Sequence, residues 1–457
     1  MTEVQKLAAF TQQRTFNDLS PDAVNALKIR LLDSLGCAIG ALQGAPIRRL
    51  KAQIDDFGGK PLVTLIGGGK TAPDRAAFYN SALVRYLDYN DSYLAKGETC
   101  HPSDNIGSVL AACEYADGDG KDFLTALAIA YQVQCRLSDV APVRHKGFDH
   151  TVQGAYGAAA GAAYGLGLTA AQTANAIAIA ATAYNALRVT RTGNLSNWKG
   201  LAYPSTGWTS THSAFLAMRG MTGPEEVFEG NKGFKEAIAG DFAIDWSKEN
   251  LERVNNTIIK KFNAEIHSQA TLEGLIEMRE AGHFKPEDIT SIELNTFDVA
   301  FHIIGGGEEG GKKNINTKEE ADHSLPYMMA AAILDGNVLP AQYRQERIVK
   351  DDIQTLLKKI EVKENPAYSD RFPEEEACDI TINFANGEQL YIEKYDYEGF
   401  TTRPASWQFI EQKFTNLSLP FTTPALRETI IDIVKNFEKH NVSALMAVLA
   451  KVSPVAY

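Results

Sequence analysis

The side chains best suited to chemistry gather in one short polar stretch, YLDYNDSYLAKGETCHPSDN at residues 86–105. Apolar segments with helical spacing lie on both sides of it. Burying so many polar groups is costly, and a simple connection between helices does not need them, so the stretch predicts a functional site. The structural alternative is a solvated turn in which Ser103 caps the next helix. The titratable and hydrogen-bonding residues of the stretch are Asp88, Asn90, Asp91, Ser92, His101 and Asp104.

Three further segments carry titratable groups that have no evident packing role. Cations bind carboxylates through charge-assisted hydrogen bonds, and histidines exchange protons near neutral pH. The combination therefore predicts a pocket for a di- or tricarboxylate, and a cleft between two domains is the usual place for such a pocket. The residues are His150, then the cations Arg188, Arg191 and Lys199, and farther along the chain His267, His323 and Tyr327.

Each of these residues also has a structural interpretation that needs no substrate. The alternatives are helix caps for His150 and His267, a solvated face or ion pairs with Asp88 or Asp91 for Arg188 and Arg191, a cation over the Trp198 ring for Lys199, and a core position for Tyr327.

Length and charge limit the classes of function. A chain of 457 residues exceeds one hydrophobic core, so two domains are expected. The formal net charge of -12 argues against a nucleic-acid partner and against an anionic membrane surface. The sequence has no apolar run of about 18 residues and no secretory pattern at its beginning, which predicts a cytoplasmic protein without a membrane segment.

The cysteines favour neither a metal nor a redox centre. The chain has five of them, and none forms a CxxC pair. An iron–sulfur cluster needs several clustered thiolates, and a structural zinc needs closely spaced Cys or His ligands. We therefore expect buried, reduced thiols and neither an iron–sulfur cluster nor a structural zinc site.

Hydrophobic periodicity predicts mostly helices up to about residue 265 and a mixed unit after it. Ser20 and Pro21 are typical of a helix start, and the Ala/Gly-rich segment 151–187 predicts two central helices that pack closely. After residue 265, a strand at 289–298 and a hairpin at 378–395 with an Asn386-Gly387 turn are interleaved with helices. The glycine-rich segment 304–320 predicts a flexible loop. The prediction is a mainly α protein, a large all-helical domain (1–265 plus 402–457) with an inserted α+β lid domain (266–401).

The chain resembles the MmgE/PrpD family over nearly its whole length. The resemblance rests on LDYNDSYLAKGETCHPSDN, the Ala/Gly-rich helices, RTGNLSNWKG, AEIHSQA and DHSLPYMMAAAILDG in this order. It implies a helical domain with an α+β lid, a homodimer and cofactor-independent chemistry on tricarboxylates. Members include 2-methylcitrate dehydratase of propionate metabolism and cis-aconitate decarboxylase, with an iminodisuccinate epimerase as a more distant relative.

The resemblance also assigns active-site positions. The segment 304–320 has no counterpart in the family pattern, and at one position this sequence has a serine where family members frequently have a threonine. These two differences leave the identity of the substrate undetermined. The positions are Asp88, His101, His150, Lys199 and Tyr327 for catalysis, with Ser92 at the position of that threonine.

These observations lead to the hypothesis of a hydro-lyase acting on 2-methylcitrate or a related tricarboxylate. Alternatives are a cis-aconitate decarboxylase, an epimerase of an imino or amino diacid, and a non-catalytic metabolite-binding homologue. In the hypothesis, the base is His101 or His150, the carboxylates and the developing negative charge are held by Lys199, Arg188 and Arg191, and the departing hydroxyl is protonated by Tyr327 or the other histidine.

Overall fold

The structure, a computed structural model, describes residues 1–282 and 284–455. The chain is mainly α, with a small sheet in its C-terminal part, as predicted. It forms two compact units. The helical unit comprises residues 1–188, 200–257 and 406–457, and the sheet unit comprises 189–199 and 258–405. Residues 189–199, 258–265 and 402–405, which the sequence analysis placed in the helical domain, group with the sheet unit.

The helical unit contains twelve of the α-helices among the described residues and two short two-stranded sheets. The strands pair as β1 with β2 and β3 with β4. Its helices are α1 (Glu3–Gln13), α2 (Pro21–Gly40), α3 (Ala45–Phe57), α4 (Pro73–Tyr86), α5 (Ile106–Tyr115), α6 (Gly120–Val140), α7 (Thr151–Gly165), α8 (Ala170–Ala183), α9 (Ala202–Met218), α17 (Trp407–Ser418), α18 (Pro424–Lys435) and α19 (Val442–Leu449); its strands are β1 (Val63–Thr64), β2 (Lys70–Thr71), β3 (Tyr93–Ala95) and β4 (Glu98–Cys100).

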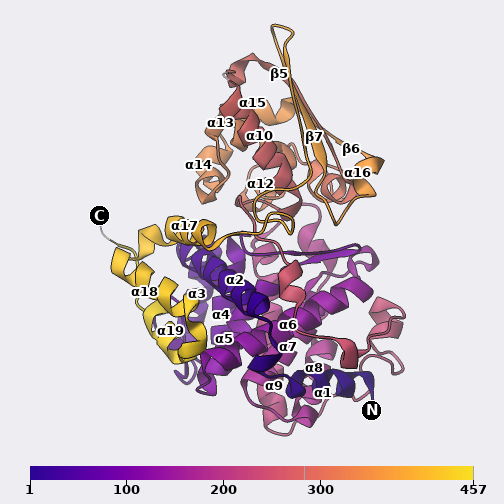
Figure 1. Cartoon of the computed structure of the whole chain (residues 1–457), viewed down its shortest axis with the longest axis vertical. Coiled ribbons are helices and arrows are strands. Elements are labelled where there is room, and N and C mark those ends of the chain that lie inside the picture. Colours follow the sequence, from indigo (N-terminus) through magenta and orange to yellow (C-terminus); the bar gives the residue numbers. More distant parts are fainter. Residues whose placement is uncertain (283, 456–457) are drawn as a thin grey trace. The chain divides into compact units, whose positions relative to one another are not determined.

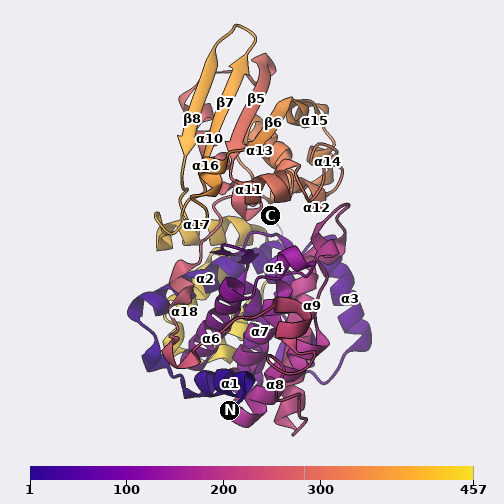
Figure 2. The ribbon, with the colours of Figure 1, turned by 90° about the vertical axis from the view of Figure 1, so that its right-hand side faces the viewer.

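The centre of this unit is α7, which packs against α6, α8 and α9 (Figure 2). The glycines of α7 permit this close packing, but their main neighbours differ from those expected. A Cβ added at Gly157 would lie 2.8 Å from the Ala130 carbonyl oxygen, and one at Gly161 would lie 3.0 Å from that of Ala126. Both carbonyls belong to α6, so the glycines bring α7 close to α6, whereas we expected the two helices of 151–187 to make the closest approach to each other.

Segments from the two ends of the chain meet in the helical unit. Ser20 caps α2 by accepting a hydrogen bond from the Ala23 amide, and Pro21 occupies its first turn, as predicted. The C-terminal helix α17 lies along α2 (Figure 1). A Cβ at Gly36 would lie 3.2 Å from the Phe414 Cα, so a larger residue there would push the two helices apart.

The sheet unit is built on a four-stranded sheet of order β6-β5-β7-β8. β5 pairs parallel to β6 and antiparallel to β7, and the predicted hairpin β7–β8 turns at Gly387, where φ is 88°. Helices α10 and α13 pack against the sheet and against each other (Figure 2). The strands are β5 (Ile289–Thr296), β6 (Ile360–Glu364), β7 (Cys378–Phe384) and β8 (Gln389–Lys394); the helices are α10 (Gln269–Ala281), α11 (Asp298–Ala300), α12 (Lys318–Ala321), α13 (Leu325–Asp335), α14 (Gln345–Ile348), α15 (Asp351–Leu356) and α16 (Pro366–Ser369).

Among the described residues, none of the helices combines the length and the apolar character needed to cross a bilayer.

One carboxylate ties several segments of the sheet unit together. Glu273 of α10 is buried and pairs with Lys261 at 2.9 Å, Lys394 at 3.0 Å and Arg403 at 2.7 Å. Burial raises the pKa of Glu273, but the bonds from the three cations outweigh that effect and lower it from 4.5 to about 2. The ionised carboxylate therefore stabilises the folded unit.

We predict that Glu273→Gln lowers the free energy of unfolding by about 1–2 kcal/mol at neutral pH, after allowance for solvent screening. Because the folded pKa lies below the unfolded one, the contribution is present above pH 4.5 and disappears as the pH falls toward 2. Thermal unfolding of the full chain as a function of pH measures it. The control is Glu293→Gln, which removes an exposed carboxylate paired with Lys363. Equal pH dependence in both variants would contradict the prediction.

Candidate active site

The polar stretch 86–105 folds into a hairpin that the sequence analysis did not predict. β3 and β4 pair antiparallel, with Tyr93 opposite Cys100. The next position outward in this register sets Ser92 opposite His101. In the hairpin, the polar residues before β3 therefore face the polar residues after β4. Their side chains hydrogen-bond to one another.

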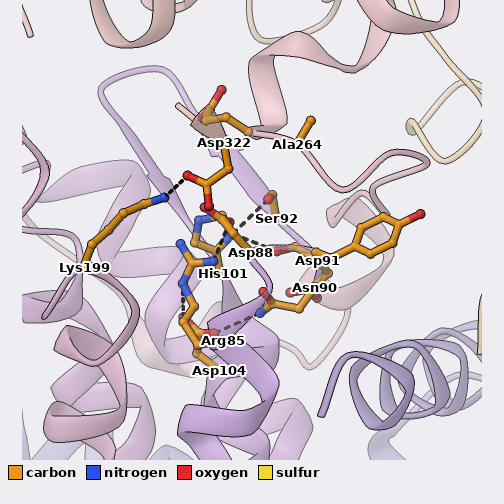
Figure 3. Close-up of polar contacts among 12 residues, drawn as sticks. Arg85, Asp88, Asn90, Asp91, Ser92, His101, Asp104, Lys199, Ala264 and Asp322 are labelled. Atoms are coloured by element: carbon orange, nitrogen blue, oxygen red, sulfur yellow. Dashed lines mark hydrogen bonds and ion pairs between the residues drawn. The ribbon is translucent and has the colours of Figure 1, made fainter. Parts of the chain in front are cut away.

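Two carboxylates at this hairpin share one buried arginine. Arg85, in the last turn of α4, pairs with Asp88 at 2.5 Å and lies 3.7 Å from Asp104 (Figure 3). Asn90 donates to Ser103 Oγ at 2.8 Å and to Asp104 Oδ1 at 2.9 Å. All five residues are buried. Arg85 is thus a partner of Asp88, and we did not select it, although its place three residues before Asp88 in an apolar helix was a signal for such a pair.

Two of the predicted catalytic histidines lie together in the helical unit. The ring centroids of His101 and His150 are 5.4 Å apart, with the planes at 74°. His101 Nδ1 lies 2.8 Å from the Asp91 carbonyl oxygen and 2.9 Å from Ser92 Oγ (Figure 3). Both histidine side chains are almost fully buried. A pair of closely spaced imidazoles is suited to removing a proton at one atom and delivering a proton at another.

His150 stands immediately before α7, but its side chain makes no capping hydrogen bond, so the cap interpretation is not supported. Its Nδ1 lies 3.4 Å from Asp149 Oδ1. Arg188 reaches the other oxygen of Asp149 at 3.9 Å. Backbone hydrogen bonds from Asp149 to Ala186 and from Arg188 to Gly147 hold these two segments side by side.

The sheet unit contains the predicted cation Lys199 in a buried cluster. Lys199 Nζ donates to Asp322 Oδ1 at 2.6 Å (Figure 3) and lies 2.8 Å from His323 Nδ1. Lys318 pairs with the other oxygen of Asp322 at 2.7 Å. Burial raises the pKa of Asp322, but Lys199 and Lys318 outweigh burial and hold it well below its usual range. Trp198 is 45% exposed while Lys199 is 3% exposed, so the surface-cation alternative does not describe this lysine.

A second histidine–carboxylate pair lies in the same unit. His267 Nδ1 is 2.8 Å from Glu265 Oε1, and the His267 amide donates to Glu265 Oε2 at 2.8 Å. The rings of Phe297 and Phe372 flank the imidazole, each with its centroid 5.7 Å away. Burial raises the pKa of Glu265, but His267 outweighs it and the pKa is lowered to about 2.

Tyr327 and Arg191, also predicted, are buried residues of the sheet unit. The Tyr327 hydroxyl donates to the Gln342 carbonyl oxygen. Burial raises the pKa of Tyr327 well above its usual value, so its phenol stays protonated. Its hydroxyl hydrogen must leave the Gln342 carbonyl before it can be given to a substrate.

Sequence reasoning missed the partner carboxylates, although a signal was present. Three of the candidate histidines have a carboxylate residue one or two positions before them. The pattern is Asp-His at two of these histidines and Glu-x-His at the third. Such a carboxylate can fix the orientation of an imidazole ring and its charge. The carboxylates are Asp149, Asp322 and Glu265.

The five cysteines all lie among the described residues, and they are buried and form no disulfide there, as expected. Burial raises the pKa of Cys113 and Cys135 well above the usual thiol value, and it raises that of Cys378 to about 12. A metal binds the thiolate rather than the thiol, so these three side chains are poor ligands.

Comparison with known proteins agrees with the sequence motifs. Residues 5–247 match the model of the MmgE/PrpD N-terminal domain, and residues 262–439 match that of the MmgE/PrpD C-terminal domain. A 2-methylcitrate dehydratase from Salmonella typhi is 27% identical over 88% of this chain and 87% of its own length. One from Escherichia coli strain K12 is 28% identical over 79% of each chain, and an alkylcitrate dehydratase from a fungal species is 26% identical over 92% and 88%. Because the two domain models together span most of the sequence, the chain belongs to the MmgE/PrpD family.

Proposed function

We propose that this protein is a carbon–oxygen lyase that removes water from 2-methylcitrate or a closely related tricarboxylate. The observation that carries the proposal is the pair of buried histidines, His101 and His150, 5.4 Å apart beside the hairpin. Relatives named 2-methylcitrate dehydratase and alkylcitrate dehydratase support the same reaction class.

In the proposed reaction, one histidine removes a proton from the carbon next to a substrate carboxylate. That carbon acid is weak, so negative charge that builds up on the adjacent carboxylate must be stabilised. The second histidine, or Tyr327, protonates the hydroxyl group that leaves as water. Ser92, which faces His101 across the hairpin, binds a polar group of the substrate.

Buried cations of the sheet unit suit the binding of an anion. Lys199 and Lys318 pair with the two oxygens of Asp322. An incoming carboxylate gains from the charge of Lys199, because this lysine is buried and poorly screened. We assign carboxylate binding to Lys199, together with Arg188, Arg191, His267 and His323.

We further propose that the chain works as a cytoplasmic homodimer in propionate metabolism, without a metal or other cofactor. The support is the family resemblance of the sequence. Light scattering of the purified protein measures the oligomeric state. Activity that is lost on chelation and restored by a metal would contradict cofactor independence.

We predict that His101→Gln lowers kcat by about 10²–10⁴-fold with 2-methylcitrate, because the proposed proton transfer loses its base. Absorbance of the unsaturated product measures turnover. The matched control is His212→Gln, which replaces a histidine of the same unit whose side chain is 54% exposed. Undiminished turnover of His101→Gln would remove this residue from the mechanism.

The same assay on a panel of citrate, cis-aconitate and their isomers separates the alternatives. Release of carbon dioxide from cis-aconitate in place of dehydration would identify a decarboxylase. Proton exchange with solvent and no net product would indicate an epimerase. Tight binding in calorimetry without turnover would indicate a metabolite-binding protein.

We predict that Lys199→Met lowers kcat/KM by roughly 10²–10³-fold, because a cation that stabilises developing charge is lost. Lys318→Met is the matched control, since it removes the cation at the other oxygen of Asp322. A double-mutant cycle of Lys199→Met with His101→Gln tests whether the two residues are energetically coupled in the transition state. Fully additive effects would contradict such coupling.

A further inference from the structure

The hydrogen bonds of His101 determine which ring nitrogen carries the proton. Its Nδ1 lies 2.8 Å from the main-chain carbonyl oxygen of Asp91. A carbonyl oxygen only accepts hydrogen bonds, so Nδ1 must be the donor. In the neutral ring, the lone pair is then on Nε2. Ser92 Oγ, 2.9 Å from the same Nδ1, can act toward the ring only as an acceptor.

The side chain of Asp91 fixes the position of that carbonyl. Asp91 Oδ1 accepts a hydrogen bond from the Ser103 amide at 3.0 Å, and Oδ2 accepts one from the Tyr131 hydroxyl at 2.7 Å. Ser103 lies just beyond the second strand of the hairpin, and Tyr131 lies in α6. The carboxylate of Asp91 therefore connects the segment before β3 to the segment after β4 and to helix α6.

The free-energy cost of burying Asp91 and Tyr131 indicates that their hydrogen bond has a functional role. Asp91 and Tyr131 are completely buried. Burial raises the pKa of Asp91 above its usual value, and the bonds from Ser103 and Tyr131 and the charge of Arg30 offset only part of that rise. Burial also raises the pKa of Tyr131 well above its usual value, so the phenol keeps its proton and donates it. Asp33, which lies in α2 together with Arg30, also acts on the charges of Arg30 and Asp91.

The preceding part of the loop is held in a similar way. Lys413 of α17 donates to the Tyr89 carbonyl oxygen at 2.8 Å and pairs with Asp33 at 2.7 Å. Its ammonium also lies 3.7 Å from the centroid of the Tyr89 ring. Two main-chain carbonyls, two residues apart, are thus fixed by α2, α6 and α17, which limits how far the Asp91 carbonyl can move from His101.

We propose that Asp91, held by Tyr131, is a positioning residue that fixes His101 as the Nδ1-protonated tautomer and makes Nε2 the atom that accepts the substrate proton. The tautomer assignment stands on the geometry of the helical unit. The catalytic part rests on the proposed function.

The first test reads the tautomer directly. Nitrogen-15 spectra of histidine-labelled full-length protein, with His101 assigned by comparison with His101→Gln, distinguish a protonated from an unprotonated Nδ1. We expect Nδ1 to be protonated and Nε2 unprotonated in the neutral ring. A wild-type spectrum with the proton on Nε2 would overturn the assignment without reference to any activity.

The second test removes one hydroxyl. In Tyr131→Phe we expect a mixture of His101 tautomers and a roughly 10-fold lower kcat, the lower end of the range for losing an outer hydrogen-bond partner, with KM nearly unchanged. The acid limb of the kcat–pH profile should move to lower pH, because the protonated ring loses more from a displaced carbonyl than the neutral ring does. The matched control is Tyr156→Phe, since the hydroxyl of this buried tyrosine of α7 has no hydrogen-bond partner among the described residues.

An unchanged tautomer and pH profile in Tyr131→Phe would overturn the positioning role. If Tyr131→Phe does not fold, Asp91→Asn replaces it, because the amide keeps one oxygen acceptor but cannot accept both hydrogen bonds as the carboxylate does. The expected tautomer together with no activity on any tricarboxylate would support the assignment of the proton and overturn the proposed function, so the two failures are distinguishable.

Discussion

The constraint on which the helical unit depends is that carboxylates removed from water need a partner for each charge. Asp88 and Asp104 share Arg85, and Asp91 is held by Tyr131 and the Ser103 amide. An isolated ionised carboxylate costs far more in the interior than a hydrogen-bonded one. Pairing of these carboxylates therefore stabilises the observed conformation of the hairpin, in which His101 lies beside His150.

In both units, histidines follow a carboxylate residue closely in the sequence. His150 follows Asp149, His323 follows Asp322, and His267 follows Glu265 by two positions. His101 differs, because its Nδ1 contacts a main-chain carbonyl. A neutral carbonyl orients the ring without adding a negative charge, whereas a carboxylate also favours the protonated imidazolium. Under the proposed function, this difference in environment favours His101 as the base and a carboxylate-paired histidine as the acid.

The buried polar groups of the two units differ in kind. The helical unit contains the two adjacent imidazoles, and the sheet unit contains Lys199 and Lys318, which pair with the same carboxylate. Glu273 of the same unit has a different role. Its three cations also pair with Glu398, Glu277 and Asp396 and join α10 to distant segments, so we interpret this cluster as structural.

The sequence by itself determined the elements whose signals are local. Helix α2 follows from the Ser20 cap, Pro21 and a long apolar periodicity, and the β7–β8 turn follows from Asn386-Gly387, because a turn with positive φ needs such residues. The family and most of the candidate residues followed from motifs. The hairpin β3–β4 was missed because its strands, of three residues each, are too short to show an alternating pattern.

Only the tertiary structure decided which charges are partners. Arg85 with Asp88 was within reach of a helical-spacing argument, but Lys199 with Asp322 joins residues 123 positions apart, and Asp91 with Tyr131 joins residues 40 positions apart. The sequence analysis offered Arg188 and Arg191 as partners of Asp88 or Asp91. The reason it could not choose is physical: the strength of an ion pair depends on burial and separation, and both arise only when distant segments have packed together.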